Sequence, residues 1–469
     1  MGDSGLRATV LRGGVILASR TGLGMVLGLI GLFIATRILG PSAYGSYVTA
    51  LGIHQLTQNI AQVGVEAYLV RGMNERAESD YDVASTFLLG VGLLVGALEA
   101  FLLPRLGDAL GISSATALLP LLAATLPVQL VTTSATARLD RDFAYGRIAS
   151  IELITQAAFY VVAAPLALVG FGAWAFAIGW VAQQVGGCIL AHAYSRWLPR
   201  PRWDWEALRR MLRYSVSYAT AIWLWQARGL VSGPLVAATL GLEAAGVVNL
   251  TIRVVEMLSF GRHLAWRVSL PALATLQNDR RKMLAAIAEG TWLQVLLVAL
   301  PLAVYGAFGA VVAHGAFGAR WLATYDLFPY LALASLTSSA FALESSALMT
   351  IAKNFEVALF HIVHLAMLTI GAFIFMKKFG MVGYGYAELF AMPSCIVLEL
   401  VFRSNIGRAS WRLTLPTYTL CAVSLALCHE GLWAAGLPFL LLAWPPTWPQ
   451  LATWLRISRS FLGWSMTQT

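Results

Sequence analysis

Residues 83–103 read VASTFLLGVGLLVGALEAFLL, a run of 21 residues in which Glu99 is the only charged side chain. The hydrocarbon core of a bilayer is about 30 Å thick, and an apolar helix of about 20 residues spans it. A backbone in lipid must pair all of its polar groups internally, and a transmembrane barrel strand needs only about half this length. The run therefore predicts a membrane-spanning α-helix.

The rest of the chain has a similar composition. Of its 469 residues, 58% are hydrophobic and 12% are charged, and the mean hydropathy is +0.71. One soluble core cannot bury so much apolar surface, so we predict an all-α integral membrane fold with 12 core helices and 14 in total. The predicted segments are 14–39, 46–70, 83–103, 115–137, 148–169, 173–193, 214–240, 244–270, 284–308, 327–351, 355–375, 382–402 and, more weakly, 413–428 and 432–445.

The formal net charge is +9, and the basic residues lie in short links between the apolar segments. Counted over alternate links, about 22 Lys and Arg fall on one side of the membrane and about 5 on the other. This asymmetry predicts an inner-membrane protein with cytoplasmic N- and C-termini. The positive charge then serves orientation, and we expect no nucleic-acid partner. The link 196–213, with six arginines, predicts an interfacial connector.

Two short motifs occur twice, in the same order. Residues 39–45 read LGPSAYG and residues 240–246 read LGLEAAG, an offset of 201. Residues 169–172 read VGFG and residues 382–385 read VGYG, an offset of 213. Six predicted helices separate the paired motifs, which indicates a parallel repeat around a central cavity. The alternative is that small residues simply favour tight turns between helices.

This repeat defines the predicted domains. An N-terminal six-helix lobe covers 1–195, a basic cytoplasmic linker covers 196–213, and a second six-helix lobe covers 214–405. Two weaker helices and a cytoplasmic tail occupy 406–469. We expect the lobes to be related by a pseudo-twofold axis near the membrane normal.

The motifs resemble the polysaccharide-exporter branch of the multidrug, oligosaccharidyl-lipid and polysaccharide flippase superfamily, specifically the O-antigen-type flippases. The resemblance is carried by ATRILGPSAYGSY at 35–47, GFGAWA at 170–175 and the second LGxxAxG, and it covers roughly residues 10 to 405. It implies two lobes that open alternately to the cytoplasm and periplasm while an undecaprenyl-pyrophosphate-linked oligosaccharide crosses, for surface or exopolysaccharide synthesis.

The chain departs from this family at one position. Many members carry an Asp in the seventh helix, about nine residues before the Gly of LGxxAxG. Here that position is Ser232, with Arg228 one turn earlier. The resemblance therefore implies no ion-coupling role for an acid at this place.

Two predicted membrane helices carry polar stripes. In segment 46–70 the stripe falls within an arc of about 100° and comprises Gln55, Gln58, Asn59, Gln62 and Glu66. In segment 244–270 it falls within an arc of about 80° and comprises Asn249, Arg253, Glu256, His263 and Arg267. The second stripe extends about 27 Å at 1.5 Å per residue. Both stripes should face water or protein, and we expect them to line the cavity.

An arginine at the bilayer centre costs at least about 2.5–3.5 kcal/mol, so its retention indicates a cavity, a partner or a ligand. Guanidinium groups bind phosphate oxygens in a planar fork. The hypothesis is that Arg20, Arg228 and Arg253 hold the headgroup phosphates, and that Arg267 and His263 add to the cationic cavity.

The structural alternative is a set of ion pairs that hold helices together. Arg253 would pair with Glu256, and the other two arginines with acids such as Glu66 or Glu152. Glu66 and Glu256 are also candidates for ion coupling. Glu99, Glu152 and Glu399 lie nearer predicted helix ends, where we expect them to snorkel to the interface.

The sequence indicates a transporter rather than an enzyme. It shows no paired nucleophile and base, no metal-ligand cluster and no phosphate loop, so we expect no cofactor or metal. The alternatives to a flippase are a multidrug or small-solute cation-coupled antiporter and a membrane glycan polymerase. The expected partners are a lipid-linked oligosaccharide, membrane lipids, a coupling proton or sodium ion, and polysaccharide polymerase and export machinery.

Overall fold

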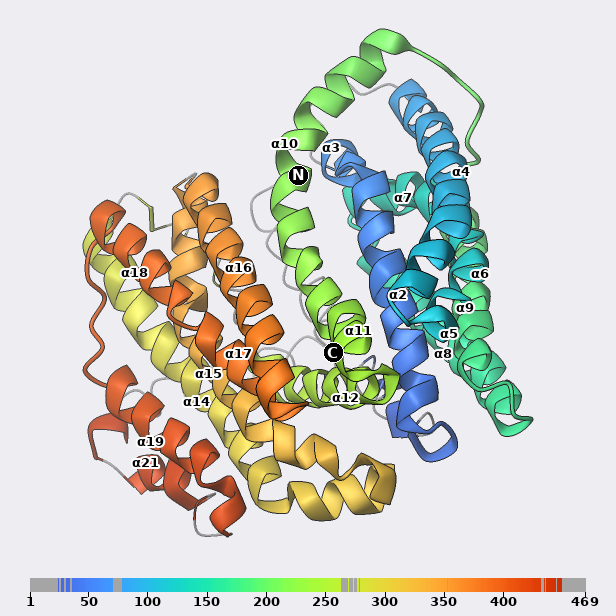
Figure 1. Cartoon of the computed structure of the whole chain (residues 1–469). Helices are drawn as coiled ribbons and strands as arrows, with labels where there is room; N and C mark the ends of the chain where they lie inside the picture. The colour runs from blue at the N-terminus through green and yellow to red at the C-terminus, as the bar shows by residue number, and fades with distance from the viewer. Residues whose placement is uncertain are drawn as a thin grey trace, which may run out of the picture. The chain divides into compact units, whose positions relative to one another are not determined.

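The computed structural model describes residues 36–70, 78–262, 279–351, 353–431 and 436–443 continuously, with 445–448 and isolated positions in 24–33, 269–277 and at 434. Every regular element within these residues is a helix, which confirms the predicted all-α fold (Figure 1). Arg20, His263 and Arg267 lie outside the described residues.

Seven described spans are long and apolar enough to cross a membrane, and a bent pair would make an eighth. These eight coincide with eight of the predicted segments. They are α4 (Glu78–Ala109), the pair Ser113–Ala123 and Leu126–Arg141 bent by 51°, α8 (Tyr145–Leu168), α9 (Ala173–Ser195), Arg280–Phe317, Ala319–Thr350, α16 (Asn354–Phe379) and Val382–Asn405.

The described residues do not reach the predicted count of twelve spans by this criterion. Segment 14–39 is mostly outside them. Segments 46–70 and 214–240 form helices that do not meet this criterion, because they are rich in polar or charged side chains, and segment 244–270 is described only in part. The proline-containing α19 (Thr414–Ala426) has only 13 residues.

The chain folds as two compact units, residues 1–249 with 316–321 and residues 250–315 with 322–469. The division falls inside α12 (Leu242–Leu258) and not at the basic linker. The reason is that α10 (Trp205–Leu230) packs along α2 (Pro41–Gln62) and α3 (Val65–Val70). The two six-helix lobes and their axis stay a prediction.

Within the first unit, α4 packs its glycine face on the bend before α7 (Leu126–Arg141). A Cβ on Gly92 would lie 2.7 Å from Pro127 Cα, and one on Gly96 would lie 2.9 Å from the Ala123 carbonyl oxygen. Glu99 follows on the same face, one turn along the helix. Close packing of the two helices therefore brings Glu99 toward α7.

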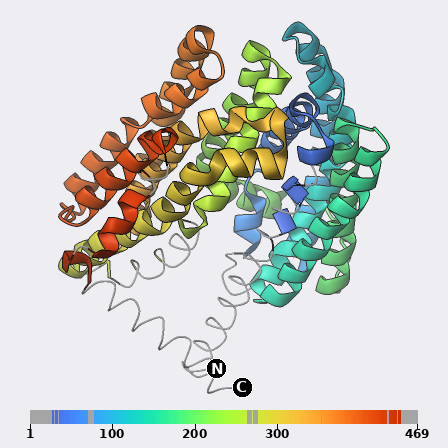
Figure 2. The same ribbon diagram turned by 90° about the horizontal axis from the view of Figure 1, so that it is seen from below.

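The opposite face of α4 is apolar and open. Leu93, Leu94 and Phe101 expose more than half of their surface. In a soluble protein such a face would need a partner, whereas lipid chains cover it in a membrane. Helices α8 and α9 run side by side in the same unit (Figure 2).

The second unit is a bundle of α14 (Arg280–Val312), α15 (Ala323–Thr350), α16, α17 (Val382–Ala391) and α18 (Ser394–Asn405), with α19 against α14 (Figure 1). Its core includes the fully buried Ile287, Leu348 and Phe402. The four cysteines are free; Cys395, Cys421 and Cys428 are buried, and Cys188 of the first unit is half-buried.

Candidate functional site

The two LGxxAxG motifs lie directly against each other within the first unit. A Cβ on Gly45 would lie 1.8 Å from the carbonyl oxygen of Leu242, and one on Gly246 would lie 2.1 Å from that of Pro41. Only glycine permits this approach at either position. The beginnings of α2 and α12, the two helices with polar stripes, are thereby fixed together.

A segment from later in the chain covers this crossing. Trp321 is 1% exposed, its indole Nε1 donates to the carbonyl of Thr36 at 3.0 Å, and its ring meets Tyr44 edge to face at 5.7 Å. The Arg37 Nε donates to the carbonyl of Ala316 at 2.9 Å. The residues 316–321 are thus built into the first unit, and we name them the strap.

The stripe on α2 changes partners along its length. Gln55 is exposed, and Gln58 and Asn59 are half-buried. The carbonyl of Asn59 accepts from Trp223 Nε1 of α10 at 2.8 Å. The Gln62 amide donates to the Glu66 carboxylate at 3.1 Å. One end of the stripe is therefore open and the other faces protein.

The stripe on α12 begins with a contact to an irregular helix. The Asn249 side-chain amide donates to the carbonyl of Ser232 at 2.7 Å and to that of Ala245 at 2.9 Å. Ser232 lies in the π-helical turn η1 (Val231–Leu235), which contains Pro234 and so lacks one backbone donor. Asn249 thus supports a distorted turn, a role that its place in the stripe did not predict.

The described charged part of this stripe belongs to the second unit, and its side chains are exposed. Arg253 and Glu256 are both exposed, and no ion pair joins them within the described chain. The structural alternative for Arg253 is therefore not formed. Arg228 belongs to the first unit and is half-buried. The cationic site itself stays a prediction.

A buried polar cluster in the first unit was not predicted. His54 of α2 is fully buried, and its Nδ1 lies 2.9 Å from Oε1 of Glu99, which is 2% exposed. The Nε2 of Gln129, on α7, lies 3.0 Å from His54 Nε2. The prediction that Glu99 snorkels is wrong, because the glycine face of α4 turns it inward. Its isolation as the only charge in 83–103 was the available signal.

A second buried acid pair lies in the second unit. Glu399 is 9% exposed and binds Arg403, and Glu344 of α15 is 1% exposed and within hydrogen-bonding reach of Glu399. The expectation that Glu399 snorkels is therefore also wrong. Glu152, by contrast, is exposed on α8. No group of three metal-ligating side chains occurs in the part of the chain that the structure describes.

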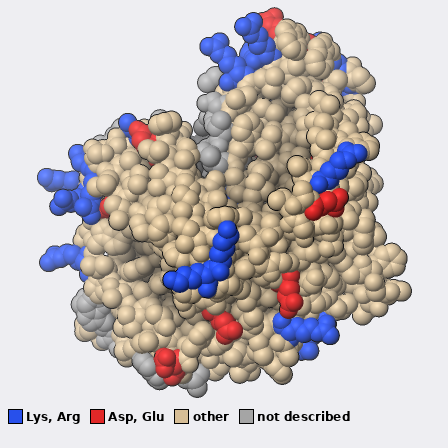
Figure 3. Space-filling model, viewed as in Figure 1, with Lys and Arg blue, Asp and Glu red and all other residues tan. Residues whose placement is uncertain are grey.

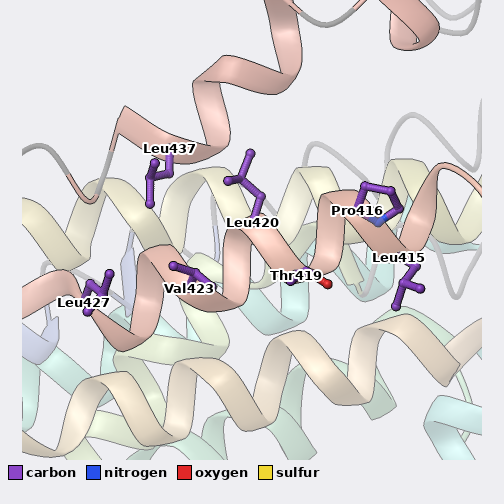
Figure 4. Close-up of a pocket in the computed structure, with 7 residues that line it drawn as sticks. All are labelled: Leu415, Pro416, Thr419, Leu420, Val423, Leu427 and Leu437. Atoms are coloured by element: carbon purple, nitrogen blue, oxygen red, sulfur yellow. The ribbon is translucent and has the colours of Figure 1, made fainter.

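Charged side chains are sparse on the face drawn in Figure 3, where they form small groups on a mostly uncharged surface. An apolar groove of about 630 Å³ lies in the second unit (Figure 4). Its lining comprises Leu415, Pro416, Thr419, Leu420, Val423, Leu427 and Leu437. Without a charged group, this groove offers nothing to a phosphate.

Comparisons with known proteins place these features in a family. The model of a family described as "Polysaccharide biosynthesis protein" matches residues 34–326, which include both LGxxAxG motifs and the strap. The succinoglycan biosynthesis transport protein ExoT of Rhizobium meliloti (strain 1021) is 25% identical over 310 residues, 64% of this chain. The match spans 61% of that relative's length.

Solved structures share the fold. The lipid II flippase MurJ, in an inward closed conformation, has a TM-score of 0.69 at 13% identity, covering 95% of this chain and 98% of that one. An inward-facing multidrug resistance MATE transporter of the MOP superfamily has a TM-score of 0.57 at 14% identity, with 84% and 98% covered. At such identities the likeness concerns the fold alone.

Proposed function

Because this chain belongs to the polysaccharide biosynthesis protein family, we propose that it is a flippase that moves an undecaprenyl-pyrophosphate-linked oligosaccharide from the cytoplasmic to the periplasmic leaflet. It is a membrane transporter of polysaccharide biosynthesis with the fold of the MOP superfamily. The relatives named above are transporters and not enzymes. The lipid-linked substrate, its direction and the cytoplasmic termini are the proposed part.

The observation that carries the proposal is the state of Arg253. It lies on a helix within a predicted membrane segment, it is exposed, and no ion pair within the described chain reaches it. An arginine facing lipid is costly, whereas one facing a water-filled passage is free to bind an anion. A guanidinium in such a place suits the pyrophosphate of a lipid carrier.

The proposed path combines this arginine with the two stripes. Gln55 and Gln58 of α2 are open or half-open and offer amide groups to sugar hydroxyls. Arg228 is the second proposed phosphate ligand, and Arg20, His263 and Arg267 complete the cationic set. Opening of the passage alternately to each side would let a charged headgroup cross without meeting lipid.

Charge reversal tests the site. In cells whose own transporter is deleted, Arg253→Glu should abolish export of the glycan at normal protein levels, and Arg253→Lys should retain part of it. Arg281→Glu is the matched control, because Arg281 is exposed near the beginning of α14 and lies outside the proposed path. Undiminished export with Arg253→Glu would refute the role of this arginine.

The second candidate function is a multidrug or small-solute antiporter, which the fold of the MATE transporter favours. Drug efflux from cells that lack glycan precursors would support it. Reconstituted protein that moves a fluorescent lipid-linked oligosaccharide between leaflets, with no sugar transfer, would support the flippase and exclude a polymerase.

A further inference from the structure

We propose that His54, Glu99 and Gln129 form a proton-binding site in the first unit, and that Glu66 is its entrance; the coupling role of this site rests on the proposed transport function. The site draws its residues from α2, α4 and α7. The ring of Trp180 on α9 meets the His54 imidazole edge to face, with 6.4 Å between the two ring centroids. Movement of any of these helices would alter the site.

The hydrogen bonds show where a proton would add. Gln129 Nε2 donates to His54 Nε2, so that nitrogen carries no proton, and Nδ1 donates its proton to Glu99. The neutral imidazole and the carboxylate together carry one negative charge. A proton taken up at Nε2 gives an imidazolium beside a carboxylate, and the net charge becomes zero.

Gln129 can serve both states. Its Nε2 also contacts Thr125 Oγ1 at 2.5 Å, whereas its Oε1 has no hydrogen-bond partner in the described chain. Rotation of the amide would present Oε1 to a protonated Nε2 and preserve the bond. Glu99 Oε2 is also buried without a partner. A cluster built only to hold helices together would leave fewer buried polar atoms unsatisfied.

Polar side chains connect this cluster to Glu66. Thr133, one turn after Gln129 on α7, donates its hydroxyl to the Gln129 carbonyl at 3.4 Å. Gln62 donates to Thr133 Oγ1 at 3.3 Å and to Glu66 Oε2 at 3.1 Å. Glu66 is half-buried and lies in the first turn of α3, the helix that precedes the predicted cytoplasmic link. The series therefore leads from Glu66 to the backbone of Gln129, whose side chain contacts His54.

The surrounding helices bring no competing charge to the site among the described residues. Helices α5 (Ser113–Thr116) and α6 (Leu119–Ala123) carry no ionisable side chain. On the other four helices the nearest ionisable groups are at least six residues away from the cluster members; they are Tyr47, Arg105, Arg138 and Cys188. Occupation by a proton would thus decide the charge of the site.

Proton counting tests the proposal on the purified full-length protein in nanodiscs. A jump from pH about 8 to about 6, followed with an indicator dye, leaves exposed carboxylates ionised. Glu99→Gln and His54→Gln should each take up one proton fewer per molecule than the wild type. Glu289→Gln is the matched control, an exposed glutamate of α14 that should leave the count unchanged.

Glu66→Gln keeps the test decisive if the buried variants fail to fold. It should slow proton uptake, because the entrance is altered while His54, Glu99 and Gln129 are kept. An unchanged count in both buried variants, or uptake at the wild-type rate in Glu66→Gln, would overturn the proposal. No glycan is needed here, so loss of export with normal proton uptake would fault the proposed function instead.

Discussion

Gly45 and Gly246, equivalent residues of the two LGxxAxG motifs, pack backbone against backbone, with each glycine facing the main chain of the other motif. Equivalent residues of a two-fold repeat contact each other only at its axis. The contact between Gly45 and Gly246 is therefore the contact expected at the axis of the predicted two-fold repeat. It also holds together α2 and α12, the two helices that carry the polar stripes. The repeat itself stays a prediction.

A side chain at this crossing should destabilise the protein. Gly246→Ala places a Cβ 2.1 Å from the Pro41 carbonyl oxygen, so one helix must shift. The expected loss is at least about 1–3 kcal/mol in the free energy of unfolding, measured by thermal unfolding in detergent. Gly90→Ala on α4 is the control, since nothing lies within 4 Å of the added Cβ. Equal stability of both variants would contradict the close contact.

Removal of the indole from the strap should release it. Trp321→Ala deletes a buried side chain together with its bond to the Thr36 carbonyl, at an expected cost of about 3–5 kcal/mol. The same substitution should also make proteolysis of the strap faster. Trp321→Phe keeps the ring against Tyr44 and loses only the hydrogen bond, so its effect should be clearly smaller. A strap equally resistant in all three proteins would disprove its anchoring.

Asn249 should matter for stability because it supports the π-helical turn. Asn249→Ala leaves the Ser232 carbonyl without its side-chain donor, at a cost of about 1–3 kcal/mol. Asn405→Ala is the control, because Asn405 donates to the Val401 carbonyl from an exposed helix end. Chemical denaturation compares the two. A larger loss with the Asn405 variant would rule out the supporting role.

The stability of α14 should depend on pH through Asp279. The Lys282 backbone N–H and ammonium hold the pKa of this N-cap carboxylate below its ordinary value. A lowered native pKa contributes stability that is fully present at neutral pH, above the ordinary value, and is lost as the pH falls through the lowered one. Asp279→Asn should lack this component of the acid dependence of Tm. Parallel pH profiles of Tm for the two proteins would contradict it.

Much of the fold was predictable from the sequence. Apolar runs such as 83–103 could only be membrane helices, the eight apolar spans lie where they were predicted, and the motifs led to the family that the comparisons confirm. The polar stripes were readable because helical periodicity is a local property. The assignment of the arginines and His263 to one cationic site, by contrast, stays a prediction.

The amino-acid sequence by itself determined that the chain lies in lipid, that it is helical and to which family it belongs. It is helical because a long apolar segment in lipid must pair its backbone polar groups internally. Only the tertiary structure decided which polar groups meet. His54 and Glu99 are 45 residues apart, and a glycine face on α4 brings them together. Partners so far apart in the chain are selected by packing between helices, which no local pattern encodes.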